Sequence, residues 1–179
     1  MARISYNNGY YEGEVNSSGE EHGYGTFVWD NGDKYVGNFA YRKFSGQGTY
    51  YYASGAKYVG QWANDLKNGK GTMYFANGNV YEGDWVNGLK HGIGRYVWKS
   101  GPSEGDVYEG EFFEDEHTGG IYYWKSGAVY EGGYLNGKYH GMGKYTFPEG
   151  DCYEGEFSHG EVVKGVIRDR EGNIIKRIG

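Results

Sequence analysis

The sequence predicts an all-β protein: an elongated, twisted and grooved single sheet of about seven antiparallel β-hairpins, with a capping hairpin at its C-terminal end. The first observation is a tyrosine, followed two residues later by glycine, at Tyr11, Tyr35, Tyr58, Tyr81, Tyr108, Tyr130 and Tyr153. These tyrosines are 22 to 27 residues apart, a spacing typical of stacked copies of one supersecondary unit. The second is composition, because 35 glycines and 21 tyrosines accompany only 37% hydrophobic residues. Aromatic rings must therefore supply most of the core.

The first strand of each repeat is clearest at Tyr81-Glu-Gly-Asp-Trp85. Apolar and acidic residues alternate there, which predicts a half-buried strand with Tyr81, Gly83 and Trp85 on one face. The pair Asn87-Gly88 follows and is typical of a tight hairpin turn.

The second strand follows the turn and ends at Ser100-Gly101. Alternation places Gly92, Gly94, Tyr96 and Trp98 on one face. A glycine within a strand leaves bare backbone, so we expect the rings of one hairpin to cover the glycines of another.

The aromatic rings are first of all expected to be structural, and a partly open face would let some of them also hold a partner segment. The position four residues after each opening tyrosine holds Val15, Phe39, Trp62, Trp85, Phe112, Tyr134 and Phe157. Binding energy concentrates on large central side chains. The predicted partner-binding groove consists of Trp62, Tyr81, Trp85, Trp98, Phe112 and Tyr134.

The whole chain, residues 1–179, is predicted to be one repeat domain. Its last segment, residues 161–179, is rich in valine and isoleucine and is predicted to be the capping hairpin that blunts the sheet edge. Self-association through the edge strands is compatible with this arrangement.

Repeat five, which begins at Tyr108, departs from the pattern. An insertion within residues 102–107 precedes it, Thr118 replaces a glycine, and the repeat is one residue short. A deletion inside a strand would turn every later side chain to the other face. We therefore expect the turn to absorb it, with a bulge near residues 118–120, unchanged faces for Tyr122 and Trp124, and a projecting acidic loop at 102–107.

The same repeat concentrates acidic residues, and two interpretations fit them. They form either a solvated loop or a docking patch for a basic partner. The patch would consist of Glu109, Glu111, Glu114, Asp115 and Glu116. Exposed charges seldom stabilise a fold, so replacing Glu114, Asp115 and Glu116 by alanine is expected to leave the melting temperature unchanged.

Basic residues give a weaker signal. Lys43, Lys67, Lys90 and Lys138 follow the hairpin turns and are predicted to form a ridge along one edge. Separated lysines support only weak adsorption to anionic phospholipid. A pI of 5.4 and the lack of a dense basic patch argue against nucleic-acid binding.

The sequence offers no constellation for catalysis, and we predict no enzyme activity, no metal site and no cofactor. His22, His91, His117 and His140 recur at what looks like one position of the repeat, and adjacent hairpins hold such positions too far apart for a shared zinc ion. Cys152 is the only cysteine, so no intrachain disulfide forms, and we expect a reduced, cytoplasmic setting.

The motif Tyr-Glu-Gly-x-Trp followed by His-Gly-x-Gly, at residues 81–94, resembles the MORN repeat (membrane occupation and recognition nexus). The resemblance covers residues 9–160. It implies a single-layer hairpin array with a groove and non-enzymatic roles, among them scaffolding in cilia, flagella and other cytoskeletal assemblies. The leading hypothesis is a scaffold that binds a partner polypeptide along the aromatic groove; the alternative is a peripheral membrane adaptor acting through the lysine ridge.

Overall fold

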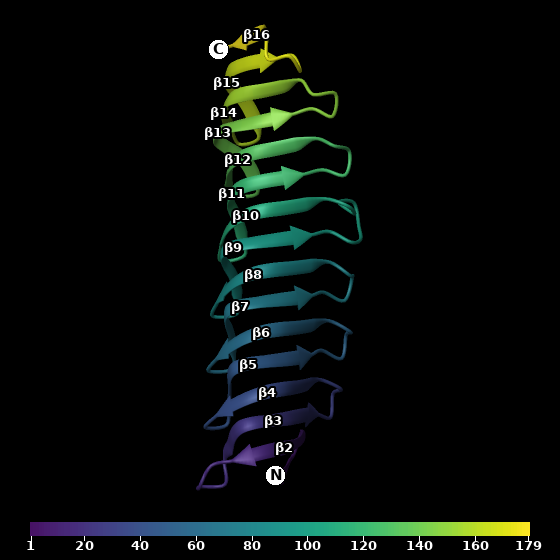
Figure 1. Cartoon of the computed structure of the whole chain (residues 1–179), viewed down its shortest axis with the longest axis vertical. Helices are drawn as coiled ribbons and strands as arrows, with labels where there is room; N and C mark the ends of the chain where they lie inside the picture. Colours follow the sequence, from purple (N-terminus) through teal and green to yellow (C-terminus); the bar gives the residue numbers. More distant parts are fainter. The chain divides into compact units, whose positions relative to one another are not determined.

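The computed structural model describes residues 1–179 and contains sixteen β-strands and no helix. The strands form one open antiparallel sheet, in which each strand follows its predecessor in chain order (Figure 1). The predicted all-β array of hairpins is confirmed. No element is a helix that could span a membrane. The chain divides into two compact units, Met1–Leu89 and Lys90–Gly179, which are described in turn.

The first unit contains eight strands, each antiparallel to the next. They are β1 (Ala2–Tyr6), β2 (Gly9–Val15), β3 (Glu21–Trp29), β4 (Lys34–Ala40), β5 (Lys43–Tyr51), β6 (Lys57–Ala63), β7 (Leu66–Tyr74) and β8 (Val80–Val86). Strand β1 was not predicted: it pairs with β2, from Ala2 opposite Gly13 to Tyr6 opposite Gly9.

The second unit contains the other strands, again antiparallel in succession. They are β9 (Leu89–Val97), β10 (Val107–Phe113), β11 (Glu116–Tyr123), β12 (Val129–Leu135), β13 (Lys138–Thr146), β14 (Cys152–Ser158), β15 (Glu161–Arg168) and β16 (Ile174–Ile178). Strands β15 and β16 pair as the predicted C-terminal hairpin. Strand β15 is also the second strand of repeat seven, because a side chain at Gly165 would meet the Tyr153 hydroxyl at 2.9 Å.

The hairpin turns of repeats two to seven are two residues long and have positive φ at the first turn residue. At Asn87-Gly88 the φ values are 49° and 88°, as in the type I′ turn that suits the twist of antiparallel strands. Asn136-Gly137 repeats this sequence, whereas Glu114-Asp115 adopts the same φ signs without asparagine or glycine. Turn geometry is therefore imposed by the strands even where the local sequence opposes it.

The core is built on the opening tyrosines, six of which are completely buried. The Tyr58 hydroxyl donates a 3.0 Å hydrogen bond to the Gln61 carbonyl, and its ring lies over Gly60 and Gly71. A Cβ atom at Gly60 would lie 2.5 Å from the Gly71 Cα. Each ring thus covers the two glycines of its own repeat. The prediction that rings cover the glycines of another hairpin was wrong for these tyrosines.

Contacts between successive repeats come from two other groups. The Trp62 indole donates to the Gly48 carbonyl at 3.2 Å, and the Trp85 indole donates to the Gly71 carbonyl at 3.1 Å. In addition, the N–H of the second turn residue donates to the preceding repeat. These turn links join Arg42 to Glu21, Asp65 to Phe44, Gly88 to Lys67, Asp115 to Lys90 and Gly160 to Tyr139. Every link ties a turn to the residue two positions after the previous turn, or to its counterpart Glu21.

Candidate partner-binding surface

The predicted groove residues are mostly core residues. Trp62, Tyr81, Trp85 and Phe112 retain 6%, 0%, 4% and 2% of their surface, respectively. Among the predicted set, only Trp98 and Tyr134 are half-buried. Four of the six side chains are therefore too enclosed to be contacted by a partner.

The accessible rings on the aromatic face, which is the face carrying the opening tyrosines, come from the second strands and the exit turns. In the first unit the half-buried rings include Trp29, Tyr50, Tyr52 and Phe75. In the second unit Tyr122 and Trp124 occupy the corresponding places. Of the rings at these repeat positions only Trp98 was predicted to bind a partner, because the predicted groove rested mainly on the first-strand motif Tyr-x-Gly-x-Trp, although the second strand follows the same alternation.

A hollow of 540 Å³ opens on the aromatic face of the second unit. Rings of two repeats surround it, namely His117, Tyr122, Trp124, Tyr134 and Tyr139. Its rim is formed by the turns of repeats six and seven and includes Lys138, His159 and Glu161. A volume of this size lies within the range of ligand pockets.

The hollow adjoins the irregular repeat five. Strand β11 pairs Gly119 with Glu111 and His117 with Phe112, so that only Thr118 is left unpaired. In repeat six the corresponding bulge leaves two residues unpaired, Gly141 and Met142. The missing residue is thus absorbed in the bulge and not, as predicted, in the turn. The predicted bulge near residues 118–120 is confirmed.

The deletion also shortens the contact with repeat six. Strands β11 and β12 pair only as far as Gly119 opposite Gly133, whereas Gly141 pairs with Phe157 between repeats six and seven. No turn link joins Gly137 to His117. The Tyr134 hydroxyl beneath this gap is buried and has no hydrogen-bond partner. The hollow is therefore the structural consequence of a shortened repeat.

The faces of Tyr122 and Trp124 are as predicted. Tyr122 lies opposite Tyr108, as Tyr145 lies opposite Tyr130 in repeat six. The Tyr122 hydroxyl donates to Asp106 at 2.8 Å, and the other Asp106 oxygen accepts the Lys125 N–H at 2.9 Å. Asp106 retains 7% of its surface, so the loop at 102–107 does not present it as part of an acidic projection.

His117 does not share the position of the other histidines. His91 and His140 lie three residues after their turns, but His117 lies two residues after its turn, where Phe44 and Tyr139 are found in other repeats. Its ring stacks on Tyr108 with centroids 4.0 Å apart. Burial, and to a smaller extent the charge of Lys90, lower its pKa to about 4. His117 is therefore a neutral member of the aromatic face at neutral pH.

The acidic patch is only partly available. Asp115 accepts the Lys90 N–H at 3.0 Å and faces its ammonium group at 3.5 Å, while Glu109 pairs with Arg95 at 2.8 Å. Glu111, Glu114 and Glu116 are exposed. These contacts set Asp115 apart from Glu114 and Glu116, and we expect its loss, unlike theirs, to lower the stability of the chain.

The lysine ridge does not assemble. Lys43 and Lys138 are the first residues after their turns, and Lys67 and Lys90 are the second. Because side chains alternate along a strand, the second pair faces the aromatic side. The Lys67 ammonium lies 4.7 Å from the Trp85 ring centroid, and the Lys90 ammonium lies 5.8 Å from that of Phe112.

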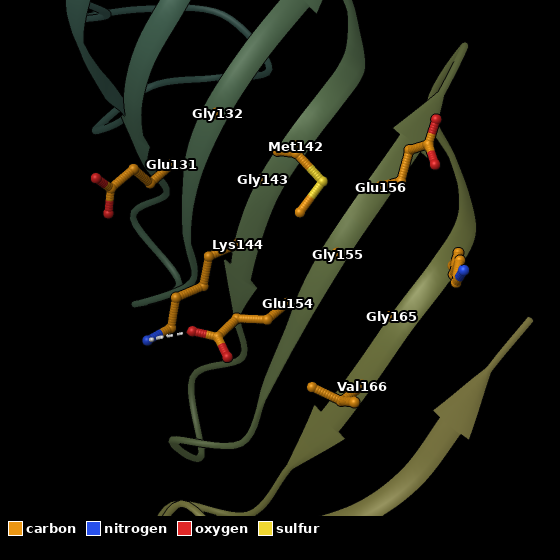
Figure 2. A pocket seen from close by; sticks show the side chains of 11 residues that line it. Glu131, Gly132, Met142, Gly143, Lys144, Glu154, Gly155, Glu156, Gly165 and Val166 are labelled. Carbon is orange, nitrogen blue, oxygen red and sulfur yellow. Dashed lines mark ion pairs between the residues drawn. The ribbon is translucent and has the colours of Figure 1, made fainter.

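A second depression, of 910 Å³, lies on the opposite face of the second unit (Figure 2). Its lining alternates in charge, and Lys144 faces Glu154 at 3.8 Å. Its bottom is the bare backbone of Gly132, Gly143, Gly155 and Gly165. The rings of Tyr130 and Tyr153 cover these glycines from the other side of the sheet. Charges of both signs surround this glycine backbone, and Met142 and Val166 are the apolar side chains of the lining.

Six segments match the family model described as MORN repeat: residues 11–34, 35–57, 58–80, 81–103, 130–152 and 153–174. The matches cover well over half of the chain. The chain belongs to the MORN-repeat family.

The MORN matches omit residues 104–129, which are repeat five and its exit loop. That segment supplies His117, Tyr122 and Trp124 to the hollow. The part of the chain that departs from the MORN pattern thus supplies one side of the hollow, and the matched repeats six and seven supply the rest.

Two solved structures of *Danio rerio* CPAP are similar to this MORN-repeat chain only at a distance. The wild-type TCP10 domain has a TM-score of 0.33 at 12% identity, with 98% of each chain covered. The same domain in complex with a peptide of *Danio rerio* STIL has a TM-score of 0.29 at 11% identity, with 98% of this chain and 97% of that chain covered. No curated protein matches the sequence. No group of three or more His, Cys, Asp or Glu side chains is placed to hold a metal ion.

Proposed function

We propose that this MORN-repeat chain is a non-catalytic scaffold that binds a partner polypeptide on the aromatic face of its second unit. The supporting observation is the hollow of 540 Å³ with half-buried rings at Tyr122, Trp124 and Tyr139. Large rings that keep part of their surface accessible are the groups that dominate protein interfaces. Rings with a polar tip are suited to such half-wet surfaces.

The cellular setting that we propose is a ciliary, flagellar or other cytoskeletal assembly. This part of the proposal rests on the roles that the MORN-repeat family implies. The exposed acids Glu111, Glu114 and Glu116 extend the proposal to a partner with a basic segment, since complementary charge speeds encounter and fixes orientation. The divided lysines give the membrane-adaptor alternative no comparable support.

The test compares two neighbouring aromatic substitutions. Trp124→Ala removes a ring from the hollow, and Tyr123→Ala removes a ring that is exposed on the opposite face of β11. A library of random peptides displayed on phage is selected on the whole chain, and each selected peptide is then measured with both variants. We expect Trp124→Ala to weaken the peptides at least tenfold, as loss of a central aromatic anchor does.

The Tyr123→Ala variant is the control for Trp124→Ala. Tyr123→Ala should bind the peptides as the unaltered chain does, and both variants should keep the circular dichroism spectrum of a β-sheet. Peptides that lose affinity with Tyr123→Ala but not with Trp124→Ala would place the binding surface on the other face and refute the proposal.

A further inference from the structure

The hollow presents ring faces to whatever enters it. Tyr122, Trp124, Tyr134 and Tyr139 line it together with His117, which is uncharged at neutral pH because burial lowers its pKa to about 4. The face of an aromatic ring carries negative electrostatic potential. It therefore attracts a cation placed over it, most strongly when the cation leaves water.

The first unit shows how rings of this face surround an ammonium group. The Lys67 ammonium lies 4.7, 5.3 and 5.8 Å from the ring centroids of Trp85, Tyr58 and Tyr52. Trp85 and Tyr134 share one position of the repeat, four residues after the opening tyrosine. The rings around Lys67 thus show that the aromatic face of this repeat can hold an ammonium group.

In the second unit, repeats five and six lack that lysine. The residues two positions after their turns are His117 and Tyr139, neither of which brings a charge at neutral pH. Their rings instead stack on Tyr108 and Tyr130 with centroids 4.0 Å apart and line the hollow, so this position adds aromatic surface to the hollow and no ammonium group.

Two polar features of the hollow also favour a ligand with a positive charge and N–H donors. Asp106 lies outside the lining, but its carboxylate accepts a hydrogen bond from the Tyr122 hydroxyl at 2.8 Å, which places a negative charge at the edge of that ring. The Tyr134 hydroxyl is buried without a partner. A buried polar group that lacks a hydrogen bond gains free energy when a ligand supplies one.

We propose that the hollow receives the ammonium group of a lysine side chain carried by an extended partner segment. This inference rests on the proposed function, since it names the chemistry of the partner residue that the same surface would hold. At the rim Lys138 and Glu161 carry opposite charges, so the rim itself does not select the sign of the ligand. Their separate removal can reveal that sign.

The experiment measures binding of three small probes to the ¹⁵N-labelled whole chain by the indole N–H resonance of Trp124. The probes are N-acetyl-lysine methylamide, its neutral counterpart N-acetyl-norleucine methylamide, and the anionic N-acetyl-glutamate methylamide. We expect the lysine probe to shift the Trp124 resonance with roughly fivefold greater affinity than the norleucine probe. The indoles of Trp29, Trp62 and Trp85 in the first unit should not move and serve as internal controls.

Two variants, each lacking one exposed charge at the rim, test the sign of the charge that the hollow binds. Lys138→Gln should strengthen binding of the lysine probe about threefold, and Glu161→Gln should weaken it about threefold, because each alters one neighbouring charge. The opposite pattern, equal affinity for the norleucine or glutamate probe, or no Trp124 shift with the lysine probe at tens of millimolar would overturn the inference.

The peptides selected to test the proposed function separate the two ideas. Peptides that depend on Trp124 and share a lysine, whose replacement by norleucine weakens them at least fivefold, support both. Peptides that depend on Trp124 but need no lysine leave the proposed function standing and refute the lysine site. An absence of peptides that depend on Trp124 refutes both.

Discussion

Replacing His117 by phenylalanine should remove a pH dependence of stability that this one ring creates. In the folded chain His117 stacks on Tyr108 and has a pKa of about 4, against an ordinary value of 6.5. The unfolded chain therefore binds a proton at a higher pH than the folded chain does. Stability is complete above the ordinary pKa, falls as the pH drops from 6.5 towards 4, and does not fall further below that.

The expected size follows from proton linkage. If the histidine were fully buried, lowering the pH from about 7.5 to about 5 would reduce the free energy of unfolding by about 2 kcal/mol. Because His117 is only half-buried, we expect screening to reduce this to roughly 1 kcal/mol. For a chain of this length that corresponds to a melting temperature lower by roughly 2–4 °C at the acidic end.

The assay is thermal unfolding followed by circular dichroism over this pH range, with the unaltered chain and His117→Phe compared at each pH. Phenylalanine is found at the same place in repeat two, as Phe44, so the ring should fit. The control is His159→Asn, at a turn position where asparagine stands in repeats four and six. It should keep the pH dependence of the unaltered chain.

Two results would refute the reasoning. One is a pH dependence in His117→Phe as large as that of the unaltered chain. The other is an NMR titration that gives His117 its ordinary pKa. Asp33 and Asp169 do not contribute over this range, because hydrogen bonds, mainly from Ala53 and Asn173, hold their pKa values below the ordinary 3.8.

Three further changes test the repeat itself by urea unfolding. Gly60→Ala should lower the free energy of unfolding by at least about 3 kcal/mol, because the new Cβ would meet backbone at 2.5 Å. Gly119→Ala, whose Cβ would have its nearest contact at 3.8 Å, should change it by no more than about 0.5 kcal/mol. Similar losses in both variants would contradict the packing argument. Asp115→Ala should lower the free energy of unfolding by about 1 kcal/mol, because the hydrogen bond from the Lys90 N–H is lost, and Glu116→Ala should leave it unchanged. An unchanged value for Asp115→Ala would show that this bond contributes no stability. Glu114→Asn should add roughly 0.5 kcal/mol, since asparagine tolerates the φ of 48° better; destabilisation would indicate an unrecognised role for the Glu114 side chain.

Features that recur in every repeat could be predicted from the sequence, whereas most features found in a single repeat or strand could not. The spacing of the tyrosines and glycines was enough for the strands and their faces, because alternation fixes both. It was not enough for β1, a single strand with no second copy to compare. It also did not reveal the burial of most predicted groove residues: a ring next to glycine can pack flat on the backbone, so that Tyr81 and Trp85 are enclosed by the sheet they belong to.

Errors of one residue explain the other corrections. Lys43 and Lys67 look equivalent in the sequence, yet they differ by one position from the turn and so face opposite sides. His117 was grouped with His91 because both precede a glycine-rich pair, whereas the bulge of repeat five places it with the rings. The hollow depends on where the ladder between β11 and β12 ends, which no local motif encodes.

The two ends of the hairpins differ in what they allow to change. A turn that donates to the preceding repeat, as Asp65 does to Phe44, must keep its length for the donor to stay in place. The exit loops close on themselves, from Trp29 to Asp33 in one case and from Trp98 to the distant Asp106 in another, and the loop-closing aspartate, not the loop length, makes the link to Ala53 or Lys125 of the next repeat. New segments can therefore be inserted into single exit loops without disturbing the repeat period. The edge of the sheet with the hairpin turns preserves the architecture, and the edge with the exit loops is free to acquire new binding specificities.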